Sequence, residues 1–134
     1  MHFKKQTKLF YSFLAIWGVL NILQAIFTDL GSDEAYYWMY SQHLAWGYFD
    51  HPPMIAVFIK MGSFIFNNEL GVRLISICSQ LFSLYFIWLI VNEDKKNIEK
   101  QNIYLFFTIA ASIVMLQAYG FITTPDVPLL FFSS

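Results

Sequence analysis

The sequence predicts an all-α integral membrane protein, polytopic, with short juxtamembrane helices in its first outer loop. Of its 134 residues, 57% are hydrophobic and only 13% are charged, whereas globular proteins usually carry about 25% charged residues. The mean hydropathy of +0.51 supports the same class. The net charge of −1 and the lack of a basic patch exclude nucleic acid as a partner, so membrane lipid is the expected surrounding.

Three segments are long and apolar enough to cross a hydrocarbon core of about 30 Å. They are residues 9–27, 72–91 and 103–122. The first could instead be a signal peptide, but it exceeds the usual apolar region and lacks a small-x-small cleavage site. We therefore predict a retained helix. A further apolar run begins at Val127 and predicts the start of a fourth span.

The apolar run 54–66 is too short for a span and contains Lys60, so we expect an interfacial or re-entrant helix there. In the span 72–91, polar residues recur at helical spacing and predict a face that packs on other helices rather than on lipid. These residues are Ser76, Ser79, Gln80 and Ser83.

Lysines flank the predicted spans unevenly, and this asymmetry predicts their orientation. The positive-inside rule places the N-terminal lysines and the loop 92–101 on the cytoplasmic side. Three spans then place residues 28–71 and 123–126 together outside the cytoplasmic (inner) membrane of a multi-pass protein. The Asp33–Glu34 pair and Asp126 are therefore expected on the same face of the membrane.

The outer stretch 32–53 is acidic and crowded with aromatic residues. Gly31–Ser32 can break the first helix and cap a second, predicted from about Asp33 to Ala45. A carboxylate beside an aromatic platform can act as a general base towards a hydroxyl group. The simpler alternatives are that the acids only complement the helix dipole and that the aromatic residues only mark the headgroup level.

Asp50 and His51 precede two prolines, which hold them on a stiff extended turn. Together with His43 they lack the ligand spacing of a zinc site. No cofactor is therefore firmly predicted, although a divalent metal ion with Asp50 as a candidate ligand stays open.

Four motifs, in the right order, resemble those of polytopic C-type glycosyltransferases, the bacterial relatives of protein O-mannosyltransferases and of lipid A aminoarabinose transferases. They are Asp33–Trp38, Gly47–Pro53, Glu69–Arg73 and Thr124–Leu130. The resemblance spans residues 9–134. It implies an enzyme that transfers a sugar from a polyprenyl-phosphate carrier, with inversion, to an acceptor outside the cytoplasmic membrane. The acceptor would be a glycan, a lipid or a protein.

The resemblance also implies roles for single residues. Asp33 matches the proposed catalytic base, Glu34 is its partner in the motif, and Asp126 matches the second acidic motif. Tyr37 falls where members of the family carry an active-site tyrosine. Asp50 falls at an acidic position that some relatives use near a metal or the carrier phosphate.

Two further positions complete the expected substrate-binding set. His51 stands where relatives often carry lysine. Arg73 is, with Lys60, a cation that could assist the phosphate leaving group. The alternatives are that Arg73 snorkels to the interface and that Lys60 is merely solvated on an amphipathic helix.

Members of this family are several times longer than 134 residues. We therefore expect residues 1–134 to be the N-terminal part of one transmembrane glycosyltransferase domain, inactive alone. The alternative function is a small four-span carrier or flippase subunit for polyprenyl-linked sugars, without catalysis. A purely structural membrane subunit would explain the hydrophobicity but not the placement of the acids.

Overall fold

The computed structural model describes residues 2–93 and 122–133, and every regular element in these ranges is an α-helix. The helices are α1 (His2–Phe27), α2 (Ser32–Gln42), α3 (Met54–Ile65), α4 (Glu69–Glu93) and α6 (Asp126–Ser133). No strand occurs among them, which confirms the all-α prediction for the described part of the chain. The expected span 103–122 lies outside the described residues, apart from Ile122.

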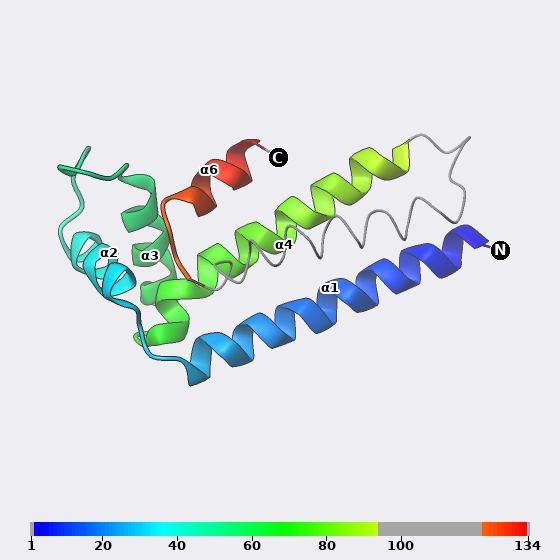
Figure 1. Ribbon diagram of the computed structural model, residues 1–134, viewed down its shortest axis with the longest axis horizontal. Helices are drawn as coiled ribbons and strands as arrows, with labels where there is room; N and C mark the ends of the chain where they lie inside the picture. Colours follow the sequence, from blue (N-terminus) through cyan, green and yellow to red (C-terminus); the bar gives the residue numbers. More distant parts are fainter. Residues whose placement is uncertain (1, 94–121, 134) are drawn as a thin grey trace.

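Helices α1 and α4 run antiparallel along the length of the molecule (Figure 1). Within them, residues 7–27 and 69–90 are long and apolar enough to cross a membrane, in agreement with the first two predicted spans. Phe10 stacks on Trp88 between the helices, with ring centroids 4.5 Å apart. Trp17 Nε1 donates a hydrogen bond to Gln80 Oε1 at 3.4 Å, a polar tie between largely apolar helices.

The polar residues of α4 face inward. Ser76, Ser79 and Gln80 are all buried, as predicted for a face that packs on other helices. The Ser79 hydroxyl donates to the carbonyl of Ile75 at 2.8 Å and so satisfies its polar group within the helix. The inward placement of these polar residues leaves apolar residues such as Phe82 and Ile90 on the exposed side of α4.

At one end of the α1–α4 pair, α3 packs on the start of α4, α2 packs on α3, and α6 packs on α4 beside them (Figure 1). The predicted short helix over 54–66 is present as α3. It buries Ile55 and Ile59 against Tyr37 and Val72, and it leaves Lys60 exposed. This end of the molecule carries the segments that the sequence analysis places outside the membrane.

Helix α2 ends at Gln42, earlier than the predicted Ala45. The Tyr48 hydroxyl explains the early end, because it lies 3.0 Å from the carbonyl oxygen of Tyr40 and 3.1 Å from that of His43. The Tyr48 ring stacks on the Tyr40 ring at 4.0 Å between centroids. The Tyr48 hydroxyl therefore provides a hydrogen-bond partner for the carbonyl groups at the end of α2, and the stacked ring holds the following loop against the helix.

Helices α3 and α4 approach each other through glycine. A Cβ atom at Gly62 would collide with the carbonyl oxygen of Gly71 and would lie 3.5 Å from Leu74 Cβ. Only a residue without a side chain fits this contact between two backbones. The close approach seats α3 directly on the first turn of α4, where Arg73 lies.

We predict that Gly62→Ala destabilises the protein by about 1–3 kcal/mol, because the added methyl group forces the two backbones apart. The measurement is the midpoint of thermal unfolding of the protein in detergent. Gly47→Ala is the matched control, since a Cβ at Gly47 meets nothing within 4 Å. Equal midpoints for the two variants would contradict the packing described.

Candidate functional site

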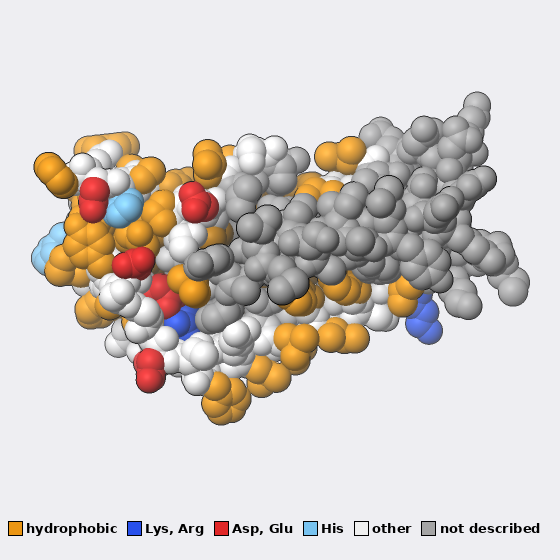
Figure 2. All heavy atoms as spheres, in the orientation of Figure 1, with side chains coloured by type: hydrophobic (Ala, Val, Ile, Leu, Met, Phe, Trp, Pro, Cys, Tyr) orange, Lys and Arg blue, Asp and Glu red, His pale blue; other side chains and the backbone are white. Residues whose placement is uncertain are grey.

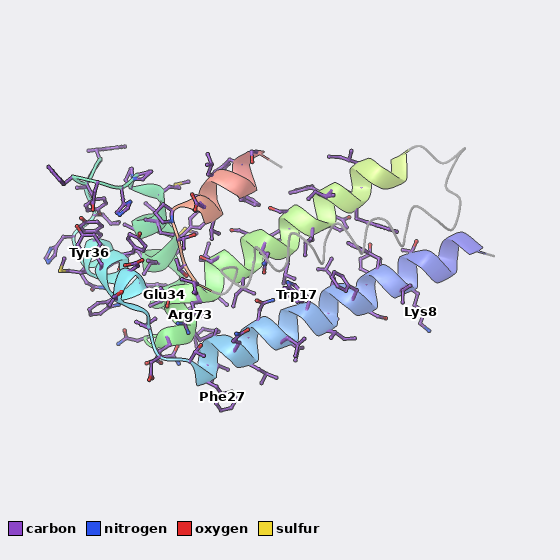
Figure 3. All side chains as sticks on the ribbon, viewed as in Figure 1. Lys8, Trp17, Phe27, Glu34, Tyr36 and Arg73 are labelled. Carbon is purple, nitrogen blue, oxygen red and sulfur yellow. The ribbon has the colours of Figure 1, made fainter. Side chains whose placement is uncertain are left out.

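A buried ion pair joins α2 to α4. Arg73 Nη2 donates to Glu34 Oε2 at 2.6 Å and Arg73 Nε donates to Glu34 Oε1 at 2.8 Å. Both side chains are only 1% exposed, and Figure 3 places them next to each other near the start of α4. This two-pronged arrangement is the strongest geometry that an arginine and a carboxylate form.

The same guanidinium group closes the end of α1. Arg73 Nη1 donates to the carbonyl oxygens of Ala25 at 3.1 Å and Thr28 at 2.7 Å, and Arg73 Nη2 donates to that of Asp29 at 2.9 Å. Carbonyl groups at a helix C-terminus lack partners within the helix, and a positive charge there is favourable. The expectation that Arg73 snorkels to the interface is therefore wrong, because the protein itself binds its charged end.

Glu34 accepts two further hydrogen bonds, both from backbone N–H groups. The donors are Gly31, at 3.0 Å, and Thr123, also at 3.0 Å. The first caps the start of α2, as a carboxylate at the third helical position commonly does. The second comes from a residue 89 positions further along the chain. One carboxylate thus joins three segments: the start of α2, the start of α4 and the stretch before α6.

The environment of Glu34 keeps it ionised. Burial by itself would raise the pKa of Glu34, but hydrogen bonds from Arg73, Thr123 and Gly31 and the charge of Arg73 outweigh burial and lower it. Glu34 is therefore not a simple surface capping residue. Glu34 also differs in its surroundings from its neighbour Asp33, because Glu34 is buried and hydrogen-bonded whereas Asp33 is exposed.

Three acids from different segments act on the charge of one phenol. Tyr37 is 6% exposed. Its pKa is raised, first by burial and then by the negative charges of Asp33, Asp50 and Asp126. All three aspartates are exposed, and the acidic side chains gather at the α2–α3 end of the molecule (Figure 2). The structure thus brings Asp33 and Asp126 to the same end, as the predicted topology requires.

The loop that carries Asp50 and His51 is fastened to α2. Asp50 Oδ1 accepts hydrogen bonds from the Tyr40 hydroxyl at 3.0 Å and the Tyr36 hydroxyl at 3.4 Å. His51 Nε2 lies 3.5 Å from both Asp50 Oδ2 and the Tyr37 hydroxyl. The exposed side of this loop therefore presents a carboxylate, an imidazole and phenols together.

Side chains that could bind a metal ion do not cluster in the part of the chain that the structure describes. In residues 2–93 and 122–133, no cluster of three or more His, Cys, Asp or Glu side chains is arranged to hold a metal ion. Asp50, the candidate ligand from the sequence, has one oxygen bonded to the two phenols and the other beside His51.

Sequence reasoning missed three contributors to this site. Tyr36 and Tyr40 lie four residues apart on α2 and share one face, so their spacing could have suggested a common partner. Thr123 gave no such signal, because its partners lie on α2 and α4, far away in sequence.

We predict that Glu34→Gln destabilises the protein by about 3–5 kcal/mol, because Arg73 then stays buried without a counter-charge. The pKa of Glu34 is lowered from 4.5, so its contribution to stability is complete above pH 4.5. That contribution is lost as the pH falls through the lowered value. Thermal unfolding measured across this pH range checks both statements. Asp33→Asn, next to it but exposed, is the control and should change stability little.

Comparison of the sequence with known proteins identifies its family. A family model described as dolichyl-phosphate-mannose-protein mannosyltransferase matches residues 50–134, which is more than half of the chain. No curated protein and no solved structure gives a match. The matched region begins at Asp50 and includes Arg73 and Asp126, and it confirms the resemblance stated from the motifs. The chain therefore belongs to the dolichyl-phosphate-mannose-protein mannosyltransferase family, a family of membrane glycosyltransferases.

Proposed function

We propose that the chain forms part of a glycosyltransferase that moves a sugar from a polyprenyl-phosphate donor to an acceptor hydroxyl on the outer side of the cytoplasmic membrane. The observation that carries this proposal is the group of exposed acids around Tyr37. Asp33 lies in the first turn of α2 and Asp126 begins α6, while Asp50 is hydrogen-bonded to Tyr36 and Tyr40 of α2. These elements lie at one end of the apolar helices α1 and α4, and the charges of all three acids raise the pKa of Tyr37. Such a site can receive a lipid-linked donor from the membrane and an acceptor from the water.

In this proposal Asp33 is the general base. The acceptor oxygen attacks the anomeric carbon from the side opposite the phosphate, and its proton passes to the Asp33 carboxylate. The bond from the anomeric carbon to the phosphate oxygen breaks, and its electron pair stays on the phosphate. The configuration at the anomeric carbon is thereby inverted. Asp33 suits this role because it is exposed, and its carboxylate accepts a hydrogen bond from the neighbouring Ser32 hydroxyl at 3.5 Å.

We assign the neighbouring groups by their exposure. Asp126 is the second acid of the site, and Asp50 and His51 offer hydrogen bonds to sugar hydroxyl groups. Tyr37, expected from the sequence to bind substrate, is buried and contacts His51 with its hydroxyl, so we propose that it orients His51. Glu34 and Arg73 satisfy each other in the interior, so we propose that they position the site rather than touch substrate. A divalent metal ion beside Asp50 stays part of the proposal as an alternative way to bind the carrier phosphate.

Lys60 is the candidate cation for the carrier phosphate. It is exposed on α3, whose neighbouring residues Met61 and Phe64 are exposed and apolar. A helix of this kind lies well at a membrane surface, where a lysine meets lipid phosphates. This arrangement would hold the phosphate of a lipid-linked donor at the level of the headgroups.

We further propose a multi-pass arrangement of the C-type glycosyltransferase fold, with residues 1–134 as the N-terminal part of one domain and the N-terminus in the cytoplasm. Lys8 lies at the end of α1 far from Glu34 and Arg73 (Figure 3), which fits lysines on the cytoplasmic side. The alternative of a carrier or flippase subunit without catalysis is not favoured by a family of transferases.

We predict that Asp33→Asn in the full-length enzyme lowers sugar transfer by about 100- to 10,000-fold, because the acceptor proton loses its base. Membrane insertion and the amount of folded protein should not change. The measurement is transfer of labelled sugar from a polyprenyl-phosphate donor in isolated membranes. Asp29→Asn, an exposed aspartate just after α1, is the control. Wild-type turnover in Asp33→Asn would overturn the assignment of the base.

A further inference from the structure

Thr123 is the point at which the segment before α6 is attached to the rest of the protein. It is 0% exposed. Its Oγ1 lies 3.2 Å from the carbonyl oxygen of Val72 and accepts a hydrogen bond from Ser76 Oγ at 3.2 Å. Its N–H donates to Glu34 Oε1. The side chain therefore binds α4 while the backbone binds α2.

The hydrogen bond from Thr123 N–H to Glu34 forms a junction between the segment before α6 and α2. Asp33 and Asp126, the two acids of the proposed mechanism, lie within a few residues of this junction. Asp33 is directly followed by Glu34. On the other side, the Thr124 carbonyl accepts from Val127 N at 3.1 Å and opens α6, whose first residue is Asp126. Each acid is therefore held close to one end of the hydrogen bond between Thr123 and Glu34.

We propose that Thr123 and Glu34 are positioning residues that fix Asp126 relative to Asp33. This inference rests on the proposed function, since the separation of the two acids matters for transfer. The hydroxyl of Thr123 sets the orientation of its own N–H, because two bonds to α4 hold the residue in one place. Arg73 keeps the accepting carboxylate ionised and in place from the other side. Neither Thr123 nor Glu34 needs to touch substrate for this role.

Thr123→Val tests the inference with little change of shape. Valine keeps the backbone N–H and the branched side chain, but it removes both hydroxyl bonds to α4. Thr123→Ser keeps the hydroxyl and is the rescuing variant. Ser79→Ala is the matched control, since it removes a buried hydroxyl of α4 whose bond goes to Ile75 within its own helix.

The first measurement reports on geometry and needs no activity. Spin labels are placed at Ala35→Cys on α2 and Leu129→Cys on α6, both exposed positions, in the full-length protein with Cys78→Ala and any other cysteines replaced. The distance distribution between the labels is measured by pulsed electron resonance in lipid nanodiscs. We expect Thr123→Val to broaden and shift this distribution, and Thr123→Ser and Ser79→Ala to leave it as in the parent. An unchanged distribution in Thr123→Val overturns the inference.

The second measurement separates positioning from stability. In the transfer assay, Thr123→Val should lower kcat per folded molecule by about 10- to 100-fold, as small misplacements of reacting groups do. KM for the donor should stay within a few-fold of the parent value, and Thr123→Ser should restore kcat. An unchanged kcat per folded molecule, with less folded protein, would show a merely structural role and overturn the inference. If the parent transfers no sugar, the proposed function falls, and the spin-label result alone decides whether the junction holds the two helices.

Discussion

The buried ion pair between Glu34 and Arg73 determines how the end of this protein that carries α2 and α3 is built. Two opposite charges are removed from water, which is tolerable only when nearly every donor and acceptor is satisfied. The partners that satisfy them are the end of α1, the start of α2, and the backbone of Thr123. None of these segments can move away without uncovering part of a charge. The ion pair therefore fixes the end of α1 and the start of α2 against α4, beside the apolar cluster that Tyr37, Ile55, Ile59 and Val72 form at the same end.

Two adjacent acids on α2 have opposite surroundings, and helix geometry explains why. Successive residues of a helix point about 100° apart, so Glu34 faces the interior while Asp33 faces the solvent. The buried acid holds the helix in place, whereas the exposed acid meets the solvent, as the proposed mechanism requires of a base. A similar division occurs in the next loop, where two phenols hold one oxygen of Asp50 and the rest of the side chain stays exposed.

Local patterns in the sequence predicted the helices well, because hydrophobic length and polar spacing are local properties. The spans at α1 and α4, the short helix α3 and the buried polar face of α4 all followed from such patterns. The partner of Arg73 could not be predicted in this way, since Glu34 lies 39 residues away and only the folded chain brings them together. The end of α2 was also misjudged, because the hydroxyl that serves its last carbonyl groups belongs to Tyr48. The convergence of Asp33 and Asp126 was foreseen only as a shared membrane face, and their common neighbour Tyr37 required coordinates.

The sequence separations within the Glu34 junction have a consequence for biosynthesis. Glu34 leaves the ribosome before Arg73, and Thr123 follows much later, 89 residues after the carboxylate that it contacts. A nascent chain that has exposed α1 and α2 alone therefore carries an unpaired acid and a helix end with bare carbonyl groups. Pairing becomes complete only after α4 and the segment before α6 have emerged. Assembly of this end is thus a late event in synthesis, and water or other polar groups must satisfy the acid and the carbonyl groups until then.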